Sequence, residues 1–183
     1  YQYYNAETGW VSFINLQYMD DTKLMGQTNF DPDTDKGTTN SWGSEIDTKK
    51  IDVSTKIGYV FKDMPFQSLG FQNAFSSYNQ DSYFGLNGYN IEQNSFYSSL
   101  IFNSIIDNEK NKFATGLNFT YDSYVEFVNT TDYSRVDNTL GAFFEYTYDN
   151  QDNFSLILGG RVDYGNRLGV FATPRVHMKY NPW

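Results

Sequence analysis

Several kinds of residue are scarce in this 183-residue chain, and each scarcity excludes a class of protein. There is no cysteine, which excludes a disulfide framework, a thiol nucleophile and a cysteine-ligated metal. No apolar run approaches the roughly 18 to 20 residues that a membrane-spanning helix needs. Lysine and arginine total 13 against 22 acidic residues, and the net charge of −9 argues against a nucleic-acid partner.

Aromatic residues and asparagine are abundant instead. The chain has 16 Tyr, 16 Phe and 3 Trp, together with 19 Asn and only 10 Leu. So many rings are costly to leave in water, which argues against disorder. The low leucine content argues against coiled coils and helical bundles.

Apolar residues alternate with polar ones along most of the chain, which is typical of β-strands with one buried face. In residues 51–62, for example, Ile51, Val53, Ile57 and Tyr59 share one parity. The pattern predicts an antiparallel up-and-down meander of about eight strands. Their approximate ranges are 9–18, 51–62, 68–78, 94–106, 113–122, 140–149, 154–164 and 170–180. Both parities carry apolar residues in 9–18 and 94–106, so the facing of these two segments stays open.

The connections between these segments alternate in length, and the predicted long loops are 19–49, 79–92 and 123–138. A meander places alternate connections at opposite ends, so one end carries large loops and the other tight turns. Bacterial outer-membrane barrels have this layout. The acidic residues of the long loops account for almost all of the net negative charge, which predicts an acidic outer rim.

Two readings of the alternation remain, a membrane barrel with the apolar parity outside and a soluble β-barrel or sandwich with that parity inside. The predicted strands are long enough to cross a bilayer at a tilt. Tyrosine and phenylalanine gather near the ends of the apolar parity, as an interfacial girdle requires. The opposite parity carries Asp52, Lys56, Glu145, Arg161, Asp163, Arg175, His177 and Lys179. These features favour the membrane barrel.

Residues 159–182, which include Thr173, Pro174 and Arg175, resemble a barrel segment of TonB-dependent outer-membrane receptors. Segments 141–149 and 82–97 are similar to the same family. The resemblance implies a bacterial outer-membrane protein that takes up a scarce ligand, such as a ferric siderophore, cobalamin or a glycan. It also implies a plug domain, the TonB complex and outer-membrane lipid as partners, and a barrel of about 22 strands.

The whole of residues 1–183 is therefore expected to be part of a transmembrane β-barrel that lacks the plug. Tyr1 to Tyr4 contain no basic or apolar region of a signal peptide. Trp183 is aromatic, but charged residues share its parity, so we expect an internal segment rather than a finished barrel. A complete eight-stranded outer-membrane barrel and a soluble ligand-binding β-barrel are the alternatives.

No catalytic site is predicted, because His177 is the only histidine and has no nucleophile at a suitable spacing. Aromatic residues of the predicted loops are the candidate ligand contacts: Trp42, Tyr83, Phe84, Tyr89, Phe127 and Tyr133. Asp31, Asp33 and Asp35 resemble the start of a calcium-binding loop, although Lys36 and Trp42 replace the glycine and glutamate of an EF-hand. Calcium is accordingly a candidate ion, and no other cofactor is expected.

Overall fold

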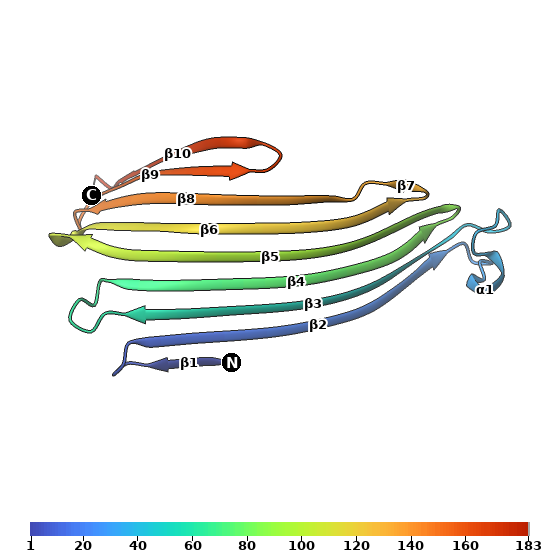
Figure 1. Cartoon of the computed structure of the whole chain (residues 1–183), viewed down its shortest axis with the longest axis horizontal. Helices are drawn as coiled ribbons and strands as arrows, with labels where there is room; N and C mark the ends of the chain where they lie inside the picture. Colours follow the sequence, from blue (N-terminus) through green and yellow to red (C-terminus); the bar gives the residue numbers. More distant parts are fainter. Residues whose placement is uncertain (183) are drawn as a thin grey trace.

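The computed structural model describes residues 1–182, which form one antiparallel sheet of ten strands (Figure 1). The elements are β1 (Gln2–Asn5), β2 (Trp10–Gly26), α1 (Pro32–Asp35), β3 (Gly43–Val60), β4 (Ser68–Phe84), β5 (Asn87–Ile106), β6 (Asn108–Val128), β7 (Thr131–Asp132), β8 (Arg135–Asp149), β9 (Phe154–Gly165) and β10 (Gly169–Tyr180). Strands that are adjacent in the sheet are consecutive in the chain, with one exception. β7 pairs only with β6 and lies outside the main order, so β6 is followed by β8. The predicted all-β meander is confirmed, while Trp183 lies outside the described residues.

The predicted count of eight strands is wrong, because the sheet has ten. Each of the eight predicted segments overlaps one of the eight long strands, and the two additional strands are β1, with four residues, and β7, with two. Such short strands have too few residues for alternation to be recognised.

The predicted loop boundaries are also wrong, because strand pairing continues far into all three segments. The β2–β3 ladder extends to Gly26 and Gly43, and the β4–β5 ladder extends to Phe84 and Asn87. The connections that remain are 27–42, which contains α1, then 85–86, and 129–134, which contains β7. Backbone hydrogen bonds need no apolar residues, so the strands continue where the alternation stops.

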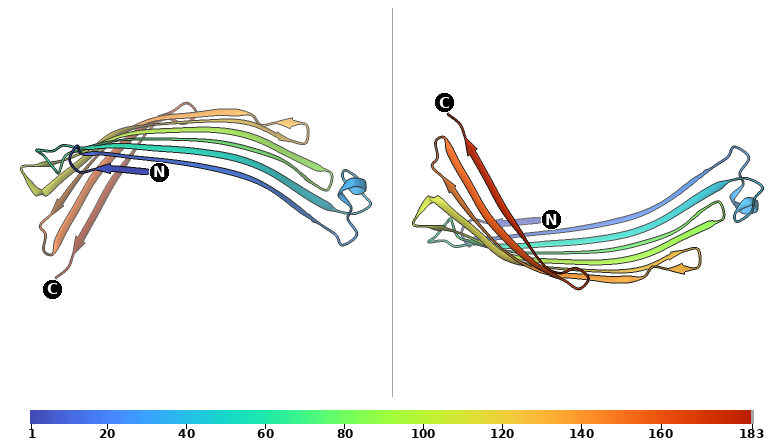
Figure 2. Two further views of the ribbon diagram at one scale, coloured as in Figure 1. Left: turned by 90° about the horizontal axis from the view of Figure 1, so that it is seen from below. Right: turned by 90° about the horizontal axis from the view of Figure 1, so that it is seen from above.

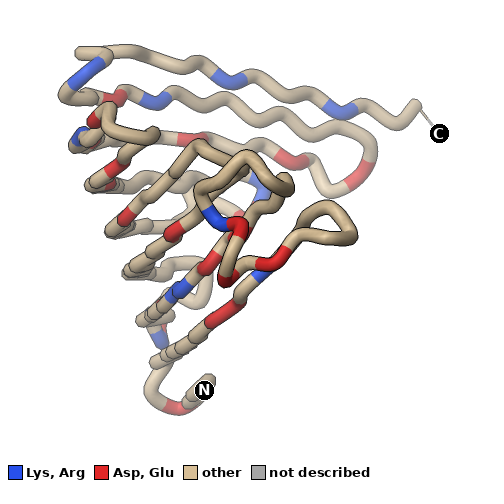
Figure 3. Tube along the Cα trace, turned by 90° about the vertical axis from the view of Figure 1, so that its right-hand side faces the viewer, with Lys and Arg blue, Asp and Glu red and all other residues tan. Residues whose placement is uncertain are grey.

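The sheet is bowed along its strands and twisted, so that β9 and β10 are rotated relative to β2 (Figure 2). It is open, with β10 at one edge and β1 and β2 at the other. We call the end with the β2–β3, β4–β5 and β6–β8 connections the loop end, and the opposite end the turn end. Viewed from the loop end, acidic residues recur from strand to strand (Figure 3).

Within residues 1–182 no apolar side chain is buried, so the sheet has no hydrophobic core of its own. Large apolar side chains such as Leu16, Leu117 and Val176 are exposed. The sheet is a single layer, and the chemistry of its two faces decides what each contacts.

Candidate functional site

One face of the sheet carries an uncharged band that crosses all eight long strands. The register places Trp10 opposite Tyr59 and Leu100 opposite Leu117 on this face. The band, here called the apolar band, consists of alternate residues, beginning with the first, in the ranges 10–18, 51–59, 69–77, 96–104, 113–121, 140–148, 154–164 and 170–180. None of these positions carries an acidic or basic side chain. The register also gives the facing that the sequence left open, with the even residues of 10–18 and 96–104 in the band.

Aromatic rings line both margins of the apolar band. At the turn end, the ring centroid of Tyr59 lies 5.0 Å from that of Trp10 and 5.1 Å from that of Phe61. Further along the same margin, Tyr148 and Phe154 are 6.2 Å apart. Tyrosines mark the loop-end margin on three strands: Tyr18, Tyr121 and Tyr164. The band thus has a chemically distinct border on each side.

The opposite face, here called the polar face, holds ion pairs at the same depth as the apolar band. Arg161 donates two hydrogen bonds of 2.6 Å to Asp163, whose residue exposure is only 3%. Arg175 donates to Glu145 over 2.8 Å. Asp163, Asn118 and Arg161 leave no space above Gly141, where an added Cβ would lie 2.2 Å from an Asp163 oxygen. Glycine is therefore required there to seat the Arg161–Asp163 pair.

A second set of polar-face residues lies beyond the apolar band and is here called the loop-end cluster: Tyr89, Tyr124, Glu126, Arg135 and Asp137. Arg135 donates a short hydrogen bond to Glu126 and lies 4.0 Å above the Tyr124 ring. The Tyr89 hydroxyl donates to the other Glu126 oxygen over 3.1 Å. Asp137 lies 3.7 Å from the Arg135 Nε. Three strands thereby contribute to one connected network.

The electrostatics of the loop-end cluster keep its ion pair charged and its phenols protonated. The hydrogen bond from Arg135 lowers the pKa of Glu126, and the same contact raises the pKa of Arg135. Burial raises the pKa of Tyr89, and the hydrogen bond to Glu126 raises it further. Burial also raises the pKa of Tyr124. The cluster therefore presents paired charges and neutral hydroxyl groups at neutral pH.

An open cavity of about 620 Å³ lies beside this cluster. Its wall includes Glu126, Tyr133, Ser134, Arg135 and Arg167. It is formed by the end of β6, the β7–β8 segment and the β9–β10 turn. The shape and the mixed lining make it a candidate site for a polar small molecule.

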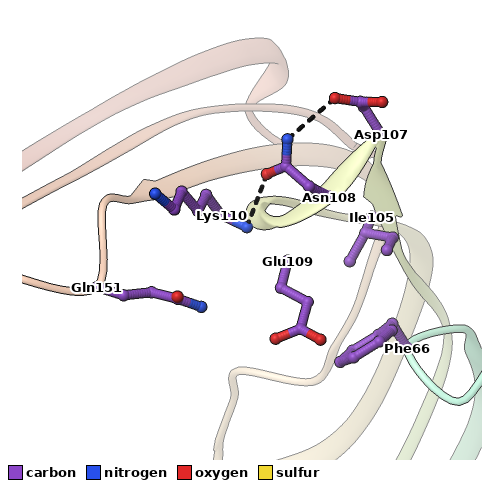
Figure 4. A pocket seen from close by; sticks show the side chains of 7 residues that line it. All are labelled: Phe66, Ile105, Asp107, Asn108, Glu109, Lys110 and Gln151. Carbon is purple, nitrogen blue, oxygen red and sulfur yellow. Dashed lines mark hydrogen bonds between the residues drawn. The ribbon is translucent and has the colours of Figure 1, made fainter.

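A hollow of about 570 Å³ at the turn end has a different character (Figure 4). Its lining comes from the β3–β4 and β8–β9 connections and from the β5–β6 hairpin, and includes Phe66, Glu109 and Gln151. Asn108 donates to the Asp107 side chain over 3.0 Å and accepts from the Lys110 backbone over 3.1 Å. These contacts stabilise the β5–β6 turn itself, so we do not regard this hollow as the functional site.

Two of the sequence-predicted ligand contacts, Tyr89 and Tyr133, lie at the loop-end cavity or its cluster. Trp42 and Tyr83 belong to a separate group around the β2–β3 loop. The Lys36 ammonium lies 4.6 Å from the Tyr83 ring centroid and 3.6 Å from Glu45. Trp42 packs against the β4–β5 turn, since a Cβ at position 85 would lie 2.9 Å from it.

The remaining two candidates lie apart from each other. Phe84 is the last residue of β4, on the polar-face parity, whereas Phe127 on β6 has the parity of the apolar band. The structure therefore does not gather all six predicted aromatic residues into one site.

The three predicted calcium ligands also do not converge. Asp31 caps α1 by accepting a hydrogen bond from the Asp33 backbone over 3.0 Å, and Asp35 accepts one from the Asp31 backbone over 3.0 Å. Among residues 1–182, no three carboxylate or imidazole groups are placed to hold a metal ion. The carboxylates of this segment stabilise the loop through local capping.

Glu126, Arg135 and Asp137 were missed by sequence reasoning. They lie in segment 123–138, which the sequence predicts to be a loop, so the sheet face that they share could not be recognised. The alternation of Tyr124, Val125, Glu126 and Phe127 is the signal that could have found them.

Comparisons with protein families, with characterised proteins and with solved structures give no match for this chain. No helix in the described residues is long and apolar enough to span a membrane.

Proposed function

We propose that this chain forms part of the wall of a TonB-dependent receptor in the bacterial outer membrane, a non-enzymatic transporter for a scarce ligand. The observation that carries the proposal is the apolar band, which crosses eight strands without a charged residue while the same strands carry ion pairs on the other face. Lipid on one side and a wet or plugged lumen on the other would satisfy both faces.

The dimensions of the apolar band fit a bilayer. On β2 the band extends from Trp10 to Tyr18, and on β10 it extends from Val170 to Tyr180. A tilted strand needs about 9 to 11 residues to cross the hydrocarbon core. Aromatic rings at both margins match the interfacial girdles of outer-membrane barrels.

The free edges of the sheet also favour membership of a larger barrel. Ile14 exchanges backbone hydrogen bonds of 2.7 and 2.9 Å with Tyr1, so the backbone groups of Leu16 and Tyr18 point to the same edge beyond β1. The Asn181 N–H donates to the carbonyl of Asn153, immediately before β9, so odd residues of β10 face β9 and even residues such as Pro174 point to the free edge. Proline needs no N–H partner there.

Within a bilayer, unpaired backbone groups at these edges would each cost several kcal/mol, about 4 or more by transfer scales. Further strands at both edges would pair them and close the wall. Direct closure of β10 onto β2 would have to displace β1, which already pairs with Trp10 to Phe13. This favours a large barrel over a complete eight-stranded one.

The transport role rests on the resemblance of residues 159–182 to TonB-dependent receptors and on the cavity at the loop end of the polar face. In that role a plug domain would occupy the lumen, and TonB would couple the proton-motive force to uptake. The transported ligand would belong to the scarce nutrients that such receptors import, which include ferric siderophores, cobalamin and glycans.

The test is an immunoblot of outer membranes from the source cells, with antibody against this chain and with boiled and unboiled samples. A heat-modifiable band several times heavier than 21.2 kDa is expected. A heat-modifiable band at that mass would favour the small barrel, and a soluble band with no heat shift would favour the soluble binder. Ligand uptake that persists after deletion of TonB would contradict the energy-coupled role.

A further inference from the structure

The cavity at the loop end contains charged groups, but each one is already paired. Arg135 bonds Glu126 and lies 3.7 Å from Asp137, and Arg167 lies 3.3 Å from Asp137. An anionic ligand would have to compete with two carboxylates for the arginines. A cationic ligand would have to compete with two arginines for the carboxylates. The wall of this cavity therefore offers no unpaired charge to either.

The groups of the cavity that remain available to a ligand are uncharged. Tyr133 lines it with 54% of its surface exposed, and Ser134 adds a hydroxyl. Beneath it, the Tyr124 hydroxyl accepts a hydrogen bond from Gln93 over 3.4 Å, and Tyr89 bonds Glu126. The exposed ring of Tyr133 beside fixed hydrogen-bonding groups suits a ligand with apolar C–H faces and many hydroxyl groups.

We infer that the loop-end cavity binds a neutral saccharide, with Tyr133 as the stacking surface and the Glu126–Arg135 pair as a fixed set of hydrogen-bonding groups. This inference rests on the proposed function and selects one ligand class within it. A volume of about 620 Å³ accommodates a short oligosaccharide, and the open side allows a longer chain to extend. Paired carboxylate and guanidinium groups can still bond adjacent hydroxyls, because each retains free lone pairs or N–H groups.

The experiment uses the full-length protein in detergent micelles, with an array of neutral oligosaccharides as one probe and ferric citrate as an anionic probe. Hits are quantified by calorimetry. Neutral oligosaccharides are expected to bind and ferric citrate is not. Tyr133→Ala should weaken saccharide affinity about tenfold, and Tyr133→Phe should retain it. Tyr4→Ala at the turn end, where Tyr4 is also exposed, is the matched control and should have no effect.

A second variant tests the charge pairing directly. Glu126→Gln removes one partner of Arg135, so ferric citrate should bind detectably to this variant although it does not bind the unmodified protein. Binding of ferric citrate by the unmodified protein, or no binding of any neutral oligosaccharide, would overturn the inference. Either result leaves the proposed function standing if the protein is a heavy heat-modifiable barrel, whereas absence from the outer membrane would contradict the function itself.

Discussion

The middle and the loop end of the same strands differ in one respect that matters for function. In residues 113–121 of β6 the odd positions carry Phe, Thr, Leu, Phe and Tyr and the even ones only small or polar residues, whereas in 122–128 both parities include polar residues. On β2, Asp20 and Thr22 follow Tyr18 on the face of the apolar band. Backbone pairing continues through both zones without interruption. Strand pairing is therefore independent of alternation, and alternation reports what lies against each face.

The largest effect is expected from charge placed in the apolar band. Leu117→Arg should lower the free energy of unfolding in lipid vesicles by about 2 to 4 kcal/mol, because it exposes a cation to hydrocarbon at mid-depth. The matched control is Val125→Arg, on the same face of the same strand but in the loop-end zone, with an expected cost of about 0 to 1 kcal/mol. Denaturant titration measures both. Equal costs would remove the distinction between the two zones.

On the polar face, the half-buried Arg161–Asp163 ion pair and the nearby Gly141 should be sensitive to added volume. Gly141→Ala would place a methyl group 2.2 Å from Asp163, so we expect a loss of about 1 to 3 kcal/mol. Gly160→Ala is the control, because nothing lies within 4 Å of its Cβ position. Denaturant titration in lipid vesicles measures both variants. A neutral Gly141→Ala would mean that the Arg161–Asp163 pair is not fixed as described.

The loop-end cluster should depend on pH in a defined direction. Because the pKa of Glu126 is lowered in the folded state, its contribution is present above the usual glutamate pKa and is lost as the pH falls through the lowered value. A spin label on Ser134→Cys should therefore become more mobile only when the pH falls below the usual glutamate range. With Glu126→Gln the label should already be mobile at neutral pH and show no such transition. If the label mobility of the Glu126→Gln variant still changed with pH, another carboxylate would be responsible for the change.

The smallest effect is expected at the β2–β3 loop. Lys36→Ala removes the contact with Tyr83 and an exposed ion pair, and should cost at most about 1 kcal/mol. Lys23→Ala, which removes only an exposed pair with Asp21, should cost less. A loss above about 2 kcal/mol for Lys36→Ala would show that this loop stabilises the sheet as a whole.

The position of each long strand could be predicted from the sequence, but its length could not. Period-two alternation identified residues 51–59 and 113–121 because their two faces meet different surroundings. The alternation stops after Tyr18 and resumes at Ile51, and both faces are more polar in between. The sequence therefore predicts a loop for the segment between these residues. The structure pairs Asp20 with Lys49 and Asp47 with Asp81 in continuous ladders. Polar strands of this kind lack the pattern that sequence reasoning uses.

The candidate site was only partly predictable for the same reason. Tyr89 and Tyr133 were chosen because rings in a loop are costly to expose. Their charged neighbours were missed, because Glu126 and Arg135 come together only through pairing between β6 and β8. The contact of Lys36 with Tyr83 depends on how a long connection folds back, which no local pattern specifies.

The most direct test of the account is a spin-label accessibility scan of residues 113–128 in lipid bilayers, one cysteine at a time, which the absence of native cysteine makes straightforward. Odd positions from 113 to 121 should be accessible to oxygen, and even positions to a water-soluble nickel complex. From 122 onward both parities should be accessible to nickel. Oxygen accessibility at the even positions, or nickel accessibility at Leu117, would contradict the assignment of the apolar band to lipid.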